Sequence, residues 1–535
     1  MENKDKIWSG DIIEFEAYIK AKTEADFEGI WDLSGAYKIG IKQENDILVG
    51  FVIDSIYDDW KPKMIKFYTK KVDNQIKTVV FYRDHSEAEI PELTLCGANM
   101  LIGENLTLHR LNSSFPDEID LSKDASYLVE MVEQTHPIFI LDGVLPNNYD
   151  ECKAEYLKAT SKPVLYDDFI IATLRYITTL KDGHMNLLTS TNLSSRLSKG
   201  IGVAFEYHNQ KLFLSNQYNV EVTHICGIPV SEILAQIERH NFFENESMRK
   251  LHLPFFARTE FFLKLAGLRA PDEKTLSITL NKNGEIVEES TEIVDNLLNH
   301  FEPLQRDYII KNEMINDIFY ISLTKFIDGD HITKVVDEIK HSIKKGIWKY
   351  IIDLRGNGGG NSHAGERLLD AMGMSLPTRG VIRRLSKLAY EQRYKQRSIQ
   401  FLIFAYFNKY IKKNKIIRKP STKSKNRNNA FVCILTDRYS FSSSTMIGDL
   451  VQDGRLGYVI GEPSSNSPTS FGDMLYITLH VLKMRIPVSY SYWMRADVNA
   501  DQETLVPDFE VSAEKALEKA IEVMSDMERV CGKKL

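Results

Sequence analysis

An apolar segment that runs into a glycine-rich turn is the feature that most restricts how this chain can fold. Residues 348–354 predict a β-strand, and Arg-Gly-Asn-Gly-Gly-Gly-Asn follows at 355–361. A strand that is apolar along its length is typical of a sheet position covered on both faces. A strand pattern at 318–323 and a helical pattern at 331–345 precede it. The region 317–512 is therefore predicted to be an α/β domain.

A second predicted strand, at 431–435, ends in a serine-rich turn. The turn reads Asp-Arg-Tyr-Ser-Phe-Ser-Ser-Ser-Thr at 437–445, and a helical pattern begins at Met446. A hydroxyl on a tight strand-to-helix connection lies at the edge of a sheet, where the following backbone N–H groups point toward whatever the hydroxyl attacks. Serine-rich turns also cap helices without any catalytic role. The turn alone leaves both interpretations open.

Two further segments bear on that choice. The glycines after Arg355 let the backbone approach a ligand closely and direct N–H groups at an oxyanion or a phosphate. A P-loop is excluded because no Lys-Ser or Lys-Thr follows the glycines, and His363 breaks the spacing of a dinucleotide site. The other segment, Asp182-Gly183-His184, follows a predicted helix that Gly183 ends. By itself it fits a surface cap as well as a catalytic base.

Together these segments resemble peptidase family S41, which includes the C-terminal-processing (tail-specific) proteases and the tricorn core. The resemblance covers roughly residues 120–515 and includes Val-Ile-Gly-Glu-Pro at 459–463 and Val-Pro-Asp at 506–508. It implies a serine peptidase with a fold related to the crotonase and ClpP group, often with an inserted PDZ domain. A strand-turn-helix pattern at 225–234 fits such a PDZ-like unit, whose groove would bind a peptide as an added strand.

The resemblance also implies roles for individual residues. Ser442 matches the nucleophile, and the N–H groups of Gly359 and Ser443 match the oxyanion hole. The processing branch of the family uses a lysine as its base, but the matching position here is Ser467, and no lysine lies between Ser442 and His480.

The chain is therefore more similar to the histidine-using, tricorn-like branch. In that branch the base matches His184, and the acid that orients it matches Asp501, with Glu503 and Asp497 close enough to compete. A neutral imidazole takes the proton of a serine hydroxyl, and a carboxylate holds the imidazole in the required tautomer. We expect serine-type hydrolysis of peptide bonds, without a metal or cofactor. The alternatives are an inactive protein of the same fold that binds peptides or apolar ligands, and an esterase.

The length of 535 residues calls for several domains. The patterns predict an N-terminal antiparallel β barrel or sandwich (1–115), a helical segment that carries His184 (116–195), a β-rich PDZ-like region (196–300), the α/β peptidase core (301–515) and a C-terminal helix (516–535).

Charge is distributed unevenly along the chain. The formal net charge of −7 gives no general attraction to nucleic acid. Residues 378–429, however, contain 16 Lys and Arg and one acidic residue, a local net charge of +15. Residues 401–407 within this basic insertion are strongly apolar. Three interpretations stay open: a segment packed on its own domain, a lid over a site for acidic substrates, or a helix at a membrane surface.

The five cysteines are scattered and form neither a disulfide framework nor a zinc spacing, which favours a reducing compartment. The N-terminus has no apolar signal region, so we expect a cytoplasmic protein, or a periplasmic or extracellular one if a leader precedes this sequence. The expected partner is a protein or peptide substrate, with a homo-oligomer left open.

Overall fold

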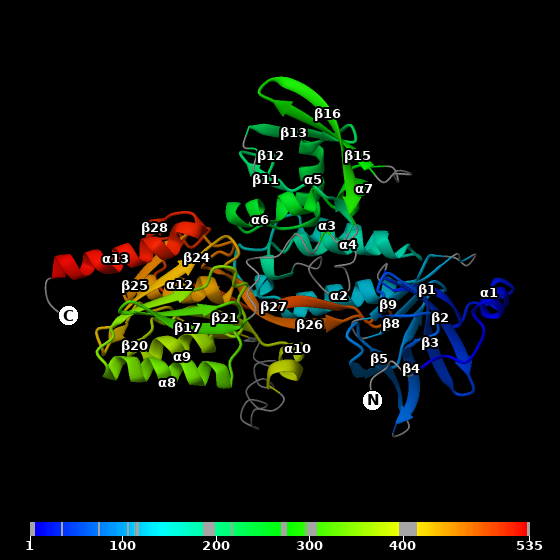
Figure 1. Ribbon diagram of the computed structural model, residues 1–535, viewed down its shortest axis with the longest axis horizontal. Helices are drawn as coiled ribbons and strands as arrows, with labels where there is room; N and C mark the ends of the chain where they lie inside the picture. Colours follow the sequence, from blue (N-terminus) through cyan, green and yellow to red (C-terminus); the bar gives the residue numbers. More distant parts are fainter. Residues whose placement is uncertain are drawn as a thin grey trace.

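The computed structural model describes residues 6–33, 36–72, 75–103, 106–111, 113, 117–185, 197, 199–215, 217, 219–268, 275–294, 297, 308–394 and 415–531. Figure 1 shows a blue N-terminal sheet at one end of the long axis and a yellow-to-red α/β domain at the other. Cyan helices lie between them, and a green β-rich unit lies above these helices.

The N-terminal region is an antiparallel sheet of nine strands in the order β6-β5-β4-β3-β2-β1-β9-β8-β7. Buried and partly exposed residues alternate along β1, which is the pattern of a strand with one face on a core. Trp31 and Trp60 are buried in that core. The elements are α1 (Ile12–Lys20), β1 (Gly29–Leu33), β2 (Tyr37–Glu44), β3 (Ile47–Ser55), β4 (Ile65–Val72), β5 (Gln75–Phe81), β6 (Glu87–Pro91), β7 (Thr94–Cys96), β8 (Met100–Gly103) and β9 (Leu106–Arg110).

Three helices follow: α2 (Ser122–Thr135), α3 (Tyr149–Ala159) and α4 (Tyr166–Thr178), with short 3-10 turns η2 (Pro137–Ile140) and η3 (Gly183–Met185). Buried Asp124 of α2 accepts hydrogen bonds from the backbone N–H groups of His480, Val481 and Leu482, in the turn of a distant hairpin. This carboxylate ties the helices to the C-terminal half of the chain.

The β-rich unit contains a second antiparallel sheet with the order β10-β16-β15-β13-β12-β11 and with β14 paired to β13. Its elements are β10 (Gly200–Ile201), β11 (Phe205–His208), β12 (Lys211–Leu214), β13 (Val220–Ile225), β14 (Ile228–Pro229), α5 (Val230–His240), α6 (Glu246–Phe256), α7 (Glu260–Leu265), β15 (Thr275–Lys282) and β16 (Glu285–Val294). The expected strand-turn-helix at 225–234 is present as β13, β14 and the start of α5. Its PDZ-like character stays a prediction.

The C-terminal domain is built on a six-stranded sheet in the order β17-β18-β19-β24-β25-β28, in which every pair except β17–β18 is parallel. Strand β19 is buried along its whole length, as its apolar sequence predicts. One face of the sheet packs against α8, α9 and α12, and the other packs against α13. The elements are β17 (Ile310–Ile315), β18 (Ile318–Leu323), α8 (Asp330–Lys344), β19 (Lys349–Asp353), α9 (His363–Ala371), β24 (Phe431–Thr436), α12 (Ser443–Asp453), β25 (Gly457–Gly461), β28 (Phe509–Glu510), η7 (Ala513–Lys515) and α13 (Ala516–Cys531).

The parallel pairing of β19 with β24 positions the two turns singled out in the sequence. Asp353 lies opposite Leu435 in the register, so both strands end at the same edge of the sheet. The glycine loop and the serine turn therefore emerge side by side. A glycine is required in this loop because a Cβ at Gly359 would lie 2.8 Å from both Phe441 O and Ser442 Cβ. Beneath the loop, Arg355 and Asp353 form an ion pair, at 2.7 Å.

A four-stranded sheet, β22-β21-β27-β26, incorporates part of the basic insertion. Strand β21 pairs with both β22 and β27, which joins the insertion to the domain. The apolar stretch at 401–407 lies outside the described residues. The elements are β20 (Met374–Ser375), β21 (Gly380–Arg384), α10 (Lys387–Ala389), η6 (Tyr390–Tyr394), β22 (Lys415–Arg418), β23 (Lys425–Asn426), β26 (Ser470–Thr478) and β27 (Arg485–Met494).

Within the described part of the chain, no helix has the length and apolar character needed to cross a membrane.

Candidate active site

Ser442 occupies the sharp turn between β24 and α12. Its backbone has φ 55° and ψ −114°, a conformation that costs a residue with a side chain roughly 1–3 kcal/mol. The Ser442 N–H donates to Asn466 Oδ1 at 3.0 Å, and the helix begins at the next residue. The turn therefore presents the Ser442 hydroxyl at the end of the sheet and at the N-terminus of α12.

The other serines of the turn are used in local structure. Ser440 Oγ donates to Leu354 O, Ser443 Oγ donates to Gly360 O, and Ser444 Oγ donates to Asn357 O, at 2.7–2.9 Å. These bonds fasten the serine turn to the glycine loop. Ser442 differs from its neighbours because its hydroxyl meets a histidine.

His184 Nε2 lies 3.1 Å from Ser442 Oγ, although 258 positions separate the two residues. His184 belongs to η3, which follows the end of α4. Its ring packs against Phe441, with 4.7 Å between ring centroids. The structure thus brings together the two residues that the sequence suggested as base and nucleophile.

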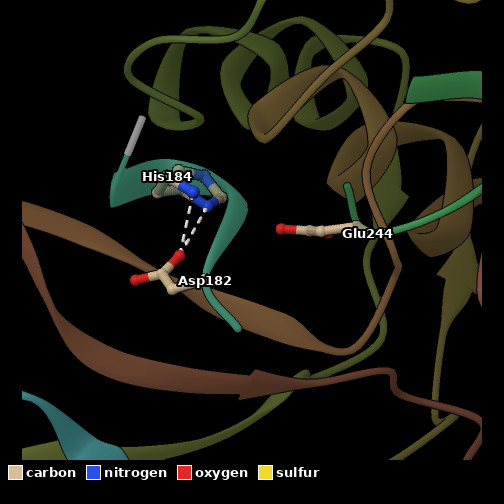
Figure 2. A group of neighbouring side chains, drawn as sticks. All are labelled: Asp182, His184 and Glu244. Atoms are coloured by element: carbon tan, nitrogen blue, oxygen red, sulfur yellow. Dashed lines mark hydrogen bonds and ion pairs between the residues drawn. The ribbon is translucent and has the colours of Figure 1, made fainter. Parts of the chain in front are cut away.

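Asp182 approaches the other nitrogen of the His184 ring, as Figure 2 shows. Its Oδ1 accepts a hydrogen bond from the His184 backbone N–H at 2.9 Å and lies 3.7 Å from Nδ1. Its Oδ2 lies 3.1 Å from Nε2 of fully buried His136. Burial opposes ionisation of Asp182, but the hydrogen bond from His136 and the adjacent imidazoles outweigh it, so the pKa of Asp182 is lowered.

Glu244 points toward His184 from a different direction (Figure 2) and comes from the loop between α5 and α6. Its Oε2 accepts hydrogen bonds from Asn466 Nδ2 at 2.6 Å and from Ser467 N–H at 2.8 Å. Burial raises the pKa of Glu244, against the opposing effects of His184 and the Ser467 N–H. A Cβ on Gly183 would lie 2.5 Å from Glu244 Oε1, so this carboxylate occupies the space that a larger residue would need.

Asp501 and Glu503, the acids suggested from the sequence, lie elsewhere. Both residues are exposed, and within the described regions no hydrogen bond or ion pair joins either of them to His184. The backbone carbonyl of Glu503 accepts hydrogen bonds from Asn245 and from the Ser467 hydroxyl. The residues close to His184 are Asp182 and Glu244 instead.

Two backbone N–H groups near Ser442 are candidates for binding an oxyanion. Ser443 is the first residue of α12, where backbone N–H groups lack partners within the helix. Gly359 N–H donates to Asn357 Oδ1 at 2.8 Å and is thereby occupied in this conformation. Gly360, the next residue, lines the cavity beside Ser442. The glycine loop thus lies against Ser442, with the Gly359 N–H bonded to Asn357 and Gly360 at the cavity wall.

A cavity of about 660 Å³ contains both Ser442 and His184 in its lining. Its wall includes aromatic and sulfur-containing side chains together with three arginines: Met446, Phe471, Met474, Tyr490, Trp493, Arg379, Arg383 and Arg393. The cavity has the size of a typical site for a small ligand or a few substrate residues.

Asp182, His184 and Glu244 each offer an atom able to bind a metal ion, and these atoms lie within 4.8 Å of one another. A cation bound to His184 would compete with the proton that the imidazole has to accept from Ser442. The arrangement therefore supports acid–base chemistry at His184 more directly than metal chemistry.

Sequence reasoning included Asp182 in a motif without giving it a role, and it missed Glu244 and Asn466. Asp182 had a detectable signal, since it stands two positions before His184. Glu244 and Asn466 had none, because each lies in a loop whose local sequence carries no pattern of its own.

The strained Ser442 thus lies at the end of a parallel strand with His184 beside it. Residues 317–511 match the model of peptidase family S41. This region of the chain is therefore similar to peptidase family S41, as its motifs indicated.

Three solved structures illustrate what the chain is similar to. The photosystem II D1 C-terminal processing protease is 12% identical over 75% of this chain and 97% of its own, with a TM-score of 0.37. Mature CPAF is 13% identical over 77% and 97%, with a TM-score of 0.46. The tricorn protease is 10% identical over 98% and 45%, with a TM-score of 0.32. None of the curated proteins compared with the chain matches it.

Proposed function

We propose that this protein is a serine peptidase that hydrolyses peptide bonds with Ser442 as nucleophile and His184 as general base. The observation that carries the proposal is the 3.1 Å separation between Ser442 Oγ and His184 Nε2 at the wall of the cavity. This separation is within the reach required for transfer of the hydroxyl proton. The strained backbone of Ser442 supports the same role, because strain of this kind is concentrated at functional sites.

The reaction proceeds through an acyl-enzyme. Ser442 Oγ attacks the substrate carbonyl carbon while its proton passes to His184 Nε2. The imidazolium then gives that proton to the leaving amine as the peptide C–N bond breaks. A water molecule attacks the ester with His184 again as base, and the proton returns to Ser442 Oγ as the acid product leaves. The N–H groups of Ser443 and Gly360 bind the negatively charged oxygen of each tetrahedral intermediate.

Asp182 is the acid that we assign to His184, in place of Asp501 or Glu503. For Nε2 to accept a proton, Nδ1 has to carry one, and Asp182 Oδ1 is 3.7 Å away. The lowered pKa of Asp182 keeps this carboxylate charged, so it stabilises the imidazolium. A small rotation of the ring closes the remaining distance, as is common when substrate tightens a catalytic hydrogen bond.

Glu244 has a positioning role in this proposal. Its Oε2 fixes the Asn466 amide, whose Oδ1 in turn holds the Ser442 N–H. Both bonds to Glu244 reach Oε2, which leaves Oε1 to hold a proton when the raised pKa favours the neutral form. With Glu244 in its neutral form, its carboxyl group does not repel the charged carboxylate of Asp182 beside His184.

A fluorophosphonate probe, which reacts with activated serines, tests the assignment. We expect the wild-type chain to be labelled, Ser442→Ala to be unlabelled, and His184→Asn to be labelled far more slowly. Equal labelling of wild type and Ser442→Ala would refute the nucleophile. Comparing hydrolysis of casein and of a p-nitrophenyl ester by the same preparation then separates a peptidase from an esterase.

A further inference from the structure

The cavity that contains Ser442 has a strongly basic wall. Three arginines line it, Arg379, Arg383 and Arg393, against a single carboxylate, Asp473. All three arginines belong to the basic insertion at 378–429. This insertion therefore brings part of its positive charge to the proposed catalytic centre.

Two of these arginines, Arg379 and Arg383, are grouped with Arg418 around one indole. The guanidinium carbons of Arg379, Arg383 and Arg418 lie 6.0, 5.0 and 5.5 Å from the centroid of the Trp493 ring. Burial and the neighbouring charges of Arg383 and Arg379 lower the pKa of Arg418. Like charges gathered around one ring repel one another, and a bound anion would relieve the repulsion.

The acids near these arginines leave positive charge uncompensated. Asp473 Oδ2 accepts from Arg383 at 3.1 Å and also from the Ser491 hydroxyl. Arg379 is 3.3 Å from Asp449, but burial raises the pKa of Asp449 to about 7, so this acid carries only part of a charge near neutral pH. Arg393 is exposed and donates to the carbonyl of Met474. Asp473 and a partly charged Asp449 therefore cannot neutralise the positive charge of these arginines.

Arg379 also lacks one hydrogen bond. Only 6% of the residue is exposed, and its Nε has no partner among the described residues. A buried donor without an acceptor costs about 1–3 kcal/mol. Guanidinium groups pair with carboxylates through two parallel hydrogen bonds, and the apolar wall suits the methylene groups of an acidic side chain.

We propose that the arginine wall of the cavity, formed by Arg379, Arg383 and Arg393, binds an acidic side chain of the substrate. The peptidase then prefers Glu or Asp at the residue that supplies the scissile carbonyl. The proposal rests on the proposed function, because the arginines can select a substrate only if Ser442 in the same cavity cleaves it. A substrate contains a second kind of carboxylate, its free C-terminus, and the test separates the two sources.

The test compares fluorogenic peptides that differ at one residue, Glu, Gln or Lys, each made with a free and with an amidated C-terminus. Hydrogen bonds between charged groups predict kcat/KM about 10- to 100-fold higher for Glu than for Gln, with Lys lowest. We expect this ratio to persist in the amidated peptides and to fall toward one in Arg383→Gln. The matched control is Lys387→Gln, an exposed residue of the same insertion that is absent from the cavity lining.

Arg393→Gln provides a second variant if Arg383→Gln fails to fold, since Arg393 is exposed. Equal cleavage of the Glu and Gln peptides by wild type overturns the proposal. Cleavage that requires a free C-terminus, whatever the side chain, overturns it in favour of a terminal carboxylate. Labelling of Ser442 by the fluorophosphonate probe distinguishes these results from failure of the proposed function, because labelling needs no peptide recognition.

Discussion

Glu244 connects the α5–α6 loop to the nucleophile turn, and replacing it has consequences that can be worked out from its contacts. In Glu244→Ala, Asn466 Nδ2 and Ser467 N–H lose their acceptor. Each buried donor left without a partner costs about 1–3 kcal/mol, so the free energy of unfolding is expected to fall by about 2–6 kcal/mol. Freed from Glu244, the Asn466 amide no longer fixes the Ser442 N–H, and displacements of about 1 Å at a catalytic centre cost roughly 100-fold in rate.

Glu244→Gln removes the ionisable carboxyl group of Glu244 but keeps the size and shape of its side chain. The glutamine oxygen still accepts both hydrogen bonds, so the variant retains the geometry but cannot ionise. Because the pKa of Glu244 is raised in the folded state, the folded protein binds more protons than the unfolded chain as pH rises above the ordinary glutamate value. The wild type therefore loses stability with rising pH in that window, by at most about 1.4 kcal/mol per pH unit, and the glutamine variant does not.

Urea unfolding at several pH values, together with the rate of fluorophosphonate labelling, measures both effects. The matched control is Glu246→Ala, two positions along and exposed at the start of α6, which should cost less than about 1 kcal/mol. Two outcomes would contradict the reasoning: a Glu244→Ala variant as stable and as reactive as the control, or a stability difference between wild type and Glu244→Gln that is constant with pH.

Two further predictions concern the residues around Ser442 and His184. Gly359→Ala should abolish labelling, because the added Cβ would lie 2.8 Å from Phe441 O and Ser442 Cβ at a φ of 100°. The control is Gly358→Ala, where the added Cβ meets no atom within 4 Å. Equal losses of labelling in both variants would refute the steric argument. Asp182→Asn should destabilise the fold at neutral pH. Because the pKa of Asp182 is lowered in the folded state, its charged carboxylate stabilises the fold at pH values above the ordinary aspartate pKa of about 4. This stabilisation is lost in more acidic solution. Thermal unfolding of both proteins from pH 7 down to pH 3 checks this, and a gap in Tm that widens in acid would contradict it.

Local patterns in the sequence were sufficient for the fold of the C-terminal domain. The apolar run of β19 and the strand-turn-helix around Ser442 are short-range features, and a strand buried on both faces can hardly be placed outside a parallel sheet. The antiparallel N-terminal sheet was predictable for the same reason, because its alternation is written along each strand. What the patterns could not supply was the pairing between distant strands, such as β21 of the basic insertion with β27.

The candidate site likewise contains residues that the sequence indicated and residues that only the structure revealed. The motifs pointed to Ser442, His184 and the glycine loop because hydroxyl, imidazole and glycine are chemical types that can be read directly from the chain. The resemblance to family S41 rests on the same motifs, and residues 317–511 match its model. The acid was placed near the C-terminus by analogy of spacing, whereas the carboxylates that lie beside His184 are Asp182 and Glu244.

The sequence by itself determined the class of chemistry, since that depends on which functional groups follow which strands. Only the tertiary structure decided which carboxylates surround the histidine, which N–H groups remain available, and that arginines of the basic insertion share a cavity with Ser442. The physical reason is that these contacts join residues up to 258 positions apart, through loops whose course is set by packing across the whole molecule and leaves no periodic trace in the chain.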